Sequence, residues 1–165
     1  MLVNNMNFKI ALLITLVIMI MLIALGVVKQ YRERHNLFLE LSMFLNEYEL
    51  NIGFKKDKLK AIISNFNAGS NTKTILNSYL DNFNNTDNLK LDNIKILQTD
   101  EQSYLVSMFG KLGRSNYENE KLQLGYFKAW ISEKLNEAKD KTTKLCPLII
   151  KLSLLFALGL AVIFI

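Results

Sequence analysis

Few residues in this chain have the types and spacing that catalysis requires. Residues 110–114 (GKLGR) contain the Gly and Lys of phosphate-binding loops, but they lack the spacing and the preceding strand of such loops. Acidic residues that are adjacent or two apart diverge on a helix, and this holds for three pairs: Asp100/Glu101, Glu118/Glu120 and Glu47/Glu49. The sequence therefore predicts neither a nucleotide site nor a carboxylate pair for acid–base catalysis.

Histidine and cysteine are too scarce for metal or disulfide chemistry. One His and one Cys cannot form a thiolate zinc site or a disulfide framework. His35 stands next to basic residues with no partner in sight, so we interpret it as a solvated side chain near the membrane. We interpret Cys146 as a chemically inert side chain that packs against its neighbours. We expect no cofactor, no metal and no enzymatic activity.

Four lysines form the densest charge cluster of the chain. Lys55, Lys56, Lys58 and Lys60 precede a predicted helix, and they could bind anionic lipid or the acidic surface of a protein partner. The alternative is an ordinary solvated loop. Nucleic acid is not an expected ligand, because Asp57 interrupts the cluster and no aromatic residues interleave with it.

The charged residues are unevenly distributed along the 165 residues. All 15 acidic residues, and all of the 20 basic residues except Lys9 and Lys151, lie in residues 29–144, which gives this segment a net charge of +3. A single Pro and seven Gly argue against a chain rich in strands and turns. We predict an all-α protein with two almost uncharged ends.

Both ends have the composition of membrane spans. Residues 10–28 form an apolar run close to the roughly 20 residues that cross a bilayer. A cleaved signal peptide is the alternative, although the run is longer than a usual signal core. Residues 145–165 form the second predicted span, in which Pro147 should kink the helix and Lys151 should reach the headgroups. A buried hairpin helix of a soluble protein is the alternative for this end.

The basic residues that flank the two spans predict the orientation. By the positive-inside rule, we expect residues 29–144 in the cytoplasm and residues 1–9 on the outer side of a bacterial cell membrane. The residues that set this topology are Lys29, Arg32, Arg34, Lys144 and Lys151, supported by Lys139 and Lys141.

Apolar residues at helical spacing predict a small helical bundle between the spans. Turn clusters at residues 67–71 and 84–88 separate the helices. The first stripe is Leu37, Leu41, Leu45, Tyr48 and Ile52, a short fourth helix is expected on Leu91, Ile94 and Leu97, and the last stripe is Leu124, Phe127, Ile131, Leu135 and Ala138. Three aromatic residues of the last helix lie either at the edge of the core or on a strip that faces a partner: Tyr117, Tyr126 and Trp130.

The junction between the last two helices carries the clearest local signals. A helix ending near Leu112 is expected to stop at Gly113 in the left-handed conformation. Ser115 and Glu118 have the spacing of a capping box that opens the long last helix.

This junction resembles the stage III sporulation protein AB family, whose signature is F-G-x-x-L-G-x-x-D-x-x-x-Q before a helix and a terminal apolar segment. The corresponding residues here are Phe109, Gly110, Leu112, Gly113, Asn116 and Glu120. One residue is missing between the second and third of these positions, and Asn and Glu replace the Asp and Gln of the signature. The resemblance extends over most of the chain, except about residues 68–100.

The resemblance implies a non-enzymatic membrane component of the channel complex between mother cell and forespore. It implies a cytoplasmic head similar to that of the inner-membrane platform protein of type II secretion systems, placed in the mother-cell membrane. The expected partners are membrane lipid, other proteins of the channel complex and a cytoplasmic secretion-type ATPase, and the sequence leaves homo-oligomerisation open. The alternative is a membrane-anchored adaptor or regulator that binds a soluble protein outside secretion.

Overall fold

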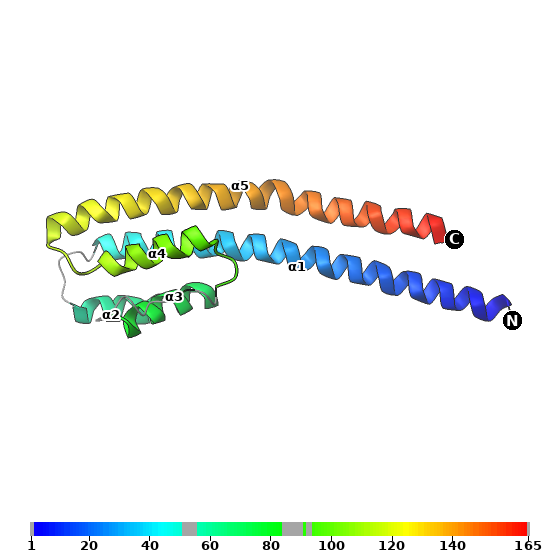
Figure 1. Ribbon diagram of the computed structural model, residues 1–165, viewed down its shortest axis with the longest axis horizontal. Helices are drawn as coiled ribbons and strands as arrows, with labels where there is room; N and C mark the ends of the chain where they lie inside the picture. Colours follow the sequence, from blue (N-terminus) through cyan, green and yellow to red (C-terminus); the bar gives the residue numbers. More distant parts are fainter. Residues whose placement is uncertain (1, 51–55, 84–90, 92–93, 165) are drawn as a thin grey trace. The chain divides into compact units, whose positions relative to one another are not determined.

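The computed structural model describes residues 2–50, 56–83, 91 and 94–164, with the backbone alone for residues 2–8, 10, 56–59, 163 and 164. Over these residues the chain is helical and contains no strand, which confirms the predicted all-α class (Figure 1). The helices are α1 (Leu2–Leu50), α2 (Lys56–Asn65), α3 (Ser70–Asp81), α4 (Thr99–Lys111) and α5 (Tyr117–Phe164).

The helices form two compact units. The end unit comprises Met1–Arg32 and Lys139–Ile165, and the head unit comprises Glu33–Ala138. Each unit takes one part of α1 and one part of α5. The division falls close to residues 29 and 144, where the charged middle of the sequence begins and ends.

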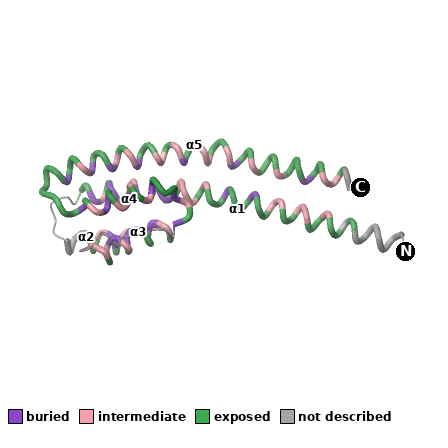
Figure 2. Tube along the Cα trace, in the orientation of Figure 1, coloured by how far each residue is buried: buried purple, intermediate pink, exposed green. Residues whose placement is uncertain are grey.

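The head unit is built around one hydrophobic core. Buried positions recur along α1, α3, α4 and the first half of α5, while exposed positions predominate in the end unit (Figure 2). In the predicted first stripe, Leu37, Leu41, Leu45 and Tyr48 of α1 are buried as expected, and Ile52 lies outside the described residues. Burying each large apolar side chain contributes about 1.5–3 kcal/mol to stability. Ile63 adds α2 to this core, which therefore explains how the five helical segments of the head remain together.

Two phenylalanines extend the predicted α1 stripe into a wider apolar face. Phe38 and Phe44 are fully buried. The Phe44 ring lies 5.8 Å from that of Phe66 and 6.4 Å from that of Phe109. These edge and tilted contacts join α1 to the segment after α2 and to α4.

The segment before α4 differs from the prediction. Leu91, Ile94 and Leu97 are buried, as the stripe required, but described residues 94–98 form turns rather than a helix. The Ile94 N–H donates to the Leu91 carbonyl at 3.0 Å, and the Leu97 N–H donates to the Ile94 carbonyl at 3.1 Å. Such a short segment cannot offset the cost of starting a helix, so consecutive turns deliver the same three side chains to the core.

The end unit pairs the first part of α1 with the last part of α5. The Thr142 hydroxyl donates to the Tyr31 carbonyl at 3.2 Å, and the Cys146 thiol lies 4.0 Å from the Val28 carbonyl. Ala24, Val28, Cys146 and Ala157 are buried, and three of these four side chains are small. Small side chains let helix backbones approach closely.

Two helical segments are long and apolar enough to cross a membrane. These are Ala11–Leu50 and Tyr117–Val162, whose most apolar windows have mean hydropathies of 3.1 and 2.3. Only 11% of each window is buried, unlike the core helix of a soluble protein. Pro147 lies inside α5, which continues to Phe164.

Candidate functional site

The six residues that carry the family resemblance lie at the junction of α4 and α5: Phe109 and Gly110 lie in the last turn of α4, Leu112, Gly113 and Asn116 form the turn, and Glu120 lies in the first turn of α5. Phe109 and Leu112 are buried in the core, and Gly110 is half-buried. Gly113 has a φ of 75°, which confirms the predicted left-handed position after α4. Side chains other than Gly are strained in this conformation, so the glycine is required by the backbone.

The start of α5 corrects the predicted capping box. The helix begins at Tyr117, and the Asn119 N–H donates to the Asn116 side-chain oxygen at 3.0 Å. Asn116 is therefore the N-cap, one residue after the predicted Ser115. The Ser115 hydroxyl instead donates to Glu120 at 3.1 Å. Asp and Asn are both good N-caps, so Asn116 provides this function at the position where the signature has Asp.

The Glu120 carboxylate is buried and holds the turn together. It accepts hydrogen bonds from the Gly113 N–H at 2.5 Å, the Ser115 N–H at 3.3 Å and the Tyr48 hydroxyl at 2.8 Å. Together with the Ser115 hydroxyl these donors satisfy the carboxylate despite its burial. The donors come from α1 and from the turn, so Glu120 connects three parts of the chain.

Two buried tyrosines accompany Glu120. Burial raises the pKa of Tyr48 far above its ordinary value, and the neighbouring Glu120 carboxylate raises it further. Burial and the same carboxylate also raise the pKa of Tyr79. The Tyr79 hydroxyl donates to the Leu112 carbonyl at 2.9 Å. Both phenols are neutral donors that fix the α4–α5 turn, and neither is available as a base near neutral pH.

A second buried carboxylate, Glu101, pairs with Arg34. The guanidinium Nη1 and Nη2 lie 2.7 and 2.6 Å from the two carboxylate oxygens, and the Arg34 and Glu101 side chains are 11% and 0% exposed. Lys134 lies 3.8 Å from the same carboxylate. The Gln98 N–H also donates to Glu101 at 3.0 Å. This network connects α1, α4 and α5 within the head unit.

The sequence reasoning missed this role of Arg34. We predicted it as a topology-setting cation, but the structure buries its charge in the head unit beside the Phe38 ring, 5.2 Å from the ring centre. A signal was present: Arg34 precedes Phe38 and Leu41 by four and seven residues, so it belongs to the buried face of α1. The other topology-setting residues, Lys29, Arg32, Lys144 and Lys151, are exposed in the end unit.

Three of the four clustered lysines lie within a helix rather than before one. Helix α2 begins at Lys56, so Lys56, Lys58 and Lys60 belong to it, and Lys55 lies outside the described residues. Of the four, only the Lys60 side chain is described, and it is exposed. Positive charges near a helix N-terminus interact unfavourably with the helix dipole, so these lysines do not stabilise the start of α2.

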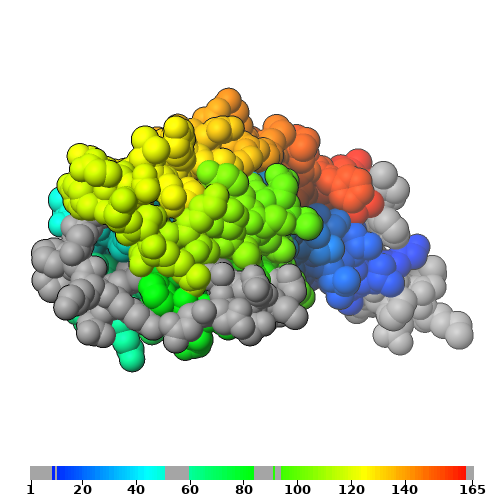
Figure 3. All heavy atoms as spheres, turned by 60° about the vertical axis from the view of Figure 1, so that its left-hand side comes forward, coloured from blue at the N-terminus to red at the C-terminus, as the bar shows by residue number. Residues whose placement is uncertain are grey.

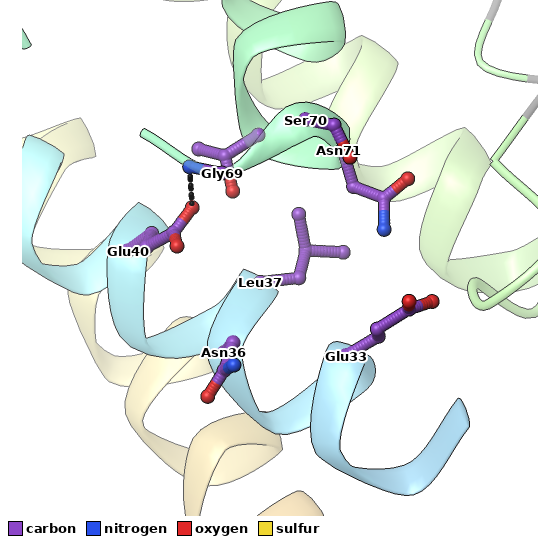
Figure 4. A pocket seen from close by; sticks show the side chains of 8 residues that line it. Glu33, Asn36, Leu37, Glu40, Gly69, Ser70 and Asn71 are labelled. Carbon is purple, nitrogen blue, oxygen red and sulfur yellow. Dashed lines mark hydrogen bonds between the residues drawn. The ribbon is translucent and has the colours of Figure 1, made fainter. Parts of the chain in front are cut away.

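A small pocket of about 170 Å³ lies between α1 and the start of α3 (Figure 4). The Gly69 N–H donates to the Glu40 carboxylate at 2.9 Å, and a Cβ at Gly69 would meet that carboxylate at 3.0 Å. Glu33 also lines the pocket, but Leu37 lies between the two carboxylates (Figure 4). Glu33 and Glu40 therefore do not converge on one ligand atom.

The three aromatic residues of α5 divide between core edge and surface. Trp130 is half-buried, and its ring stacks on Tyr104 at 4.2 Å between centres, where α4 lies along the first half of α5 (Figure 3). Tyr117 and Tyr126 are exposed. Tyr126 lines a shallow hollow on the outer face of α5, together with Glu118, Lys121, Leu122 and Gly125.

No group of three or more metal-ligating side chains occurs among the described residues. Comparisons of the chain with protein-family models, with curated proteins and with solved structures find no match. The two buried carboxylates, Glu101 and Glu120, are bound by groups of the head itself and hold its helices together. Of the surfaces described above, the outer face of α5 remains as the candidate site of interaction.

Proposed function

We propose that the chain is a two-span membrane protein whose head is a non-enzymatic helical bundle that docks a protein partner in the cytoplasm. The exposed apolar surface of the end unit supports the anchoring. Two described features support the absence of catalysis: Glu101 and Glu120 are satisfied by groups of the fold itself, and the phenols beside Glu120 are held neutral.

The observation that carries the docking role is the outer face of α5 in the head unit. Leu122 and Tyr126 are 62% and 64% exposed, and Gly125 between them opens a shallow hollow. Exposed aromatic and aliphatic side chains around a hollow are typical of protein interfaces. Glu118 and Lys121 place one negative and one positive charge at the rim, so the hollow favours neither sign of charge in a partner.

The resemblance to the stage III sporulation protein AB family supplies the proposed setting. In that setting the head is a platform in the mother-cell membrane, and its partner is a cytoplasmic secretion-type ATPase. Deleting the gene tests this part: arrested spore development is the expected result. Normal sporulation would contradict it and would favour an adaptor or regulator outside secretion.

The docking face is tested by substitutions that leave the core intact. Leu122→Ser with Tyr126→Ser should weaken binding of the ATPase to the full-length protein by about tenfold or more, as expected for central interface residues. Glu133→Gln, an exposed change on the same helix, is the matched control and should leave binding unchanged. Unchanged binding of the double variant would exclude this face.

The lysine cluster is tested separately. Replacing Lys55, Lys56, Lys58 and Lys60 by Glu should reduce binding if these residues contribute to docking, because four charge reversals oppose an acidic partner surface. Binding equal to wild type would remove the cluster from the interface and leave the α5 face as the docking site.

A further inference from the structure

Five basic residues of α1 and α5 lie at the same level along the helix pair of the end unit. The contacts of Thr142 with Tyr31 and of Cys146 with Val28 fix the register between α1 and α5, so residues 29–32 lie beside residues 139–146. These two stretches contain one acidic residue, Asp140, and five basic residues, which we call the collar: Lys29, Arg32, Lys139, Lys141 and Lys144.

The collar lies where the exposed apolar surface begins. Along α1 the residues just before it include the exposed Leu25 and Val27, and along α5 the residues just after it include the exposed Leu148 and Ile150. In a membrane-spanning helix pair, the boundary between apolar and charged surface lies at the depth of the lipid headgroups. The collar is therefore at the level of the phosphates if the end unit spans the membrane.

The positive charge of the protein belongs to the end unit rather than the head. The end unit carries seven basic residues against Asp140, whereas Glu33–Ala138 has 13 basic and 14 acidic residues, a net charge of −1. Lys144 pairs with Asp140 at 2.9 Å, but their side chains are 74% and 67% exposed, so this pair offsets the charge of Lys144 only weakly. Lys29 and Lys141 also interact with other residues of the chain.

We propose that the collar binds the headgroups of anionic phospholipids, such as phosphatidylglycerol, in the membrane that holds the end unit. This inference rests on the proposed membrane anchoring and adds a lipid preference to it. Clustered lysine and arginine side chains at the membrane surface attract anionic lipids, and their long alkyl stems let the charged groups reach the phosphates. A soluble acidic partner fits less well, because the collar adjoins lipid-facing apolar residues on both helices.

The test measures which lipids the full-length protein retains. The protein is reconstituted in an equal mixture of phosphatidylcholine and phosphatidylglycerol, extracted in mild detergent and purified, and the retained lipids are quantified by mass spectrometry. We expect phosphatidylglycerol to be enriched about threefold or more over phosphatidylcholine, because each basic side chain adds attraction to anionic headgroups. Equal retention of the two lipids would overturn the proposal.

Two variants identify the collar as the cause. Replacing Lys29, Arg32, Lys139 and Lys144 by Gln should abolish the enrichment, whereas replacing the same lysines by Arg should preserve it and show that charge matters. The control replaces three exposed head lysines outside the lysine cluster by Gln: Lys73, Lys95 and Lys111. Enrichment that persists in the Gln collar variant, or disappears in the head control, would contradict the assignment.

Two further measurements distinguish lipid binding by the collar from the proposed membrane anchoring and from binding of free phosphate. Soluble glycerol phosphate added in excess should not displace the lipid, and displacement would identify a free-phosphate site instead. Alkaline carbonate washing of cell membranes tests the anchoring itself. Release of the wild-type protein would overturn the proposed anchoring, whereas a retained protein without lipid enrichment would overturn the collar alone.

Discussion

The end unit and the head unit use similar numbers of apolar residues in opposite ways. In the head, large apolar side chains such as Phe38 and Phe44 are fully buried, whereas in the end unit Leu22 and Phe156 are each 63% exposed. The head is nearly neutral overall, while the end unit is strongly basic at one level. The head therefore has a hydrophobic core of its own, whereas the described residues of the end unit leave most of their large apolar side chains exposed.

A second contrast lies within the head, between its two buried carboxylates. Glu101 is compensated by the charges of Arg34 and Lys134, while Glu120 is compensated by backbone N–H groups and hydroxyls. Breaking an ion pair leaves a buried charge without compensation, whereas losing Glu120 leaves neutral donors unpaired. The first loss should therefore cost more.

The largest effect is expected from Glu101→Gln. This change leaves the Arg34 guanidinium buried without a counter-charge, so the free energy of unfolding should fall by about 3–5 kcal/mol. Urea unfolding of the full-length protein, followed by the fluorescence of Trp130, measures it. Glu137→Gln removes a more exposed partner of Lys134 and should cost less than about 1 kcal/mol. Equal costs for the two changes would contradict the buried network.

Glu120→Ala is expected to have the next largest effect. It leaves the Tyr48 hydroxyl and the Gly113 and Ser115 N–H groups without their acceptor, and the expected loss is about 2–3 kcal/mol. Glu120→Gln keeps one acceptor oxygen and should cost less. Hydrogen exchange of residues 113–116 should increase in the Ala variant, and unchanged exchange would remove Glu120 from the control of this turn.

Alkaline pH should weaken the head through its buried tyrosines. The pKa values of Tyr48 and Tyr79 are raised above the ordinary 10.0, so the folded state keeps protons that the unfolded chain loses. This contribution is fully present below pH 10 and is lost as the pH rises above it, by about 1.4 kcal/mol per pH unit for each tyrosine. Unfolding measured from pH 8 to 11 tests this, and Tyr48→Phe with Tyr79→Phe should flatten the dependence.

Gly113→Ala and Gly125→Ala should act in opposite directions, with the smallest expected effects. A Cβ at Gly113 is strained at a φ of 75°, which should cost about 1 kcal/mol or somewhat more. Gly125 lies inside α5 with open space where its Cβ would be, so Ala there should stabilise the protein by up to about 1 kcal/mol. The same sign for both changes would contradict the assigned backbone conformations.

Local signals in the sequence predicted where the helices lie, but they did not predict which residues of different helices contact each other. The α1 stripe and the left-handed Gly113 follow from spacing and residue type, which act over a few residues. The pairing of Arg34 with Glu101 joins residues 67 positions apart, and periodicity carries no information about such partners. The predicted helix on Leu91, Ile94 and Leu97 failed because apolar spacing indicates which side chains are buried, not which backbone delivers them.

The contacts that close the α4–α5 turn were predicted only in part. The resemblance selected the α4–α5 turn, and the structure gives Gly113, Asn116 and Glu120 clear roles in closing it. The hydrogen bond between Glu120 and Tyr48 was not predictable, because α1 and α5 meet only in the folded chain. The collar was visible as separate charges, but its assembly depends on the register between α1 and α5.

The orientation of the head is the most direct test of the proposed function. Cys146→Ser removes the single native thiol, and Asn77→Cys and Asn5→Cys then place one thiol in the head and one near the N-terminus. In intact cells, a reagent that cannot cross the membrane should label the thiol at position 5 and leave the thiol at position 77 unlabelled until the cells are opened. Labelling at position 77 in intact cells would place the head outside and contradict docking of a cytoplasmic partner.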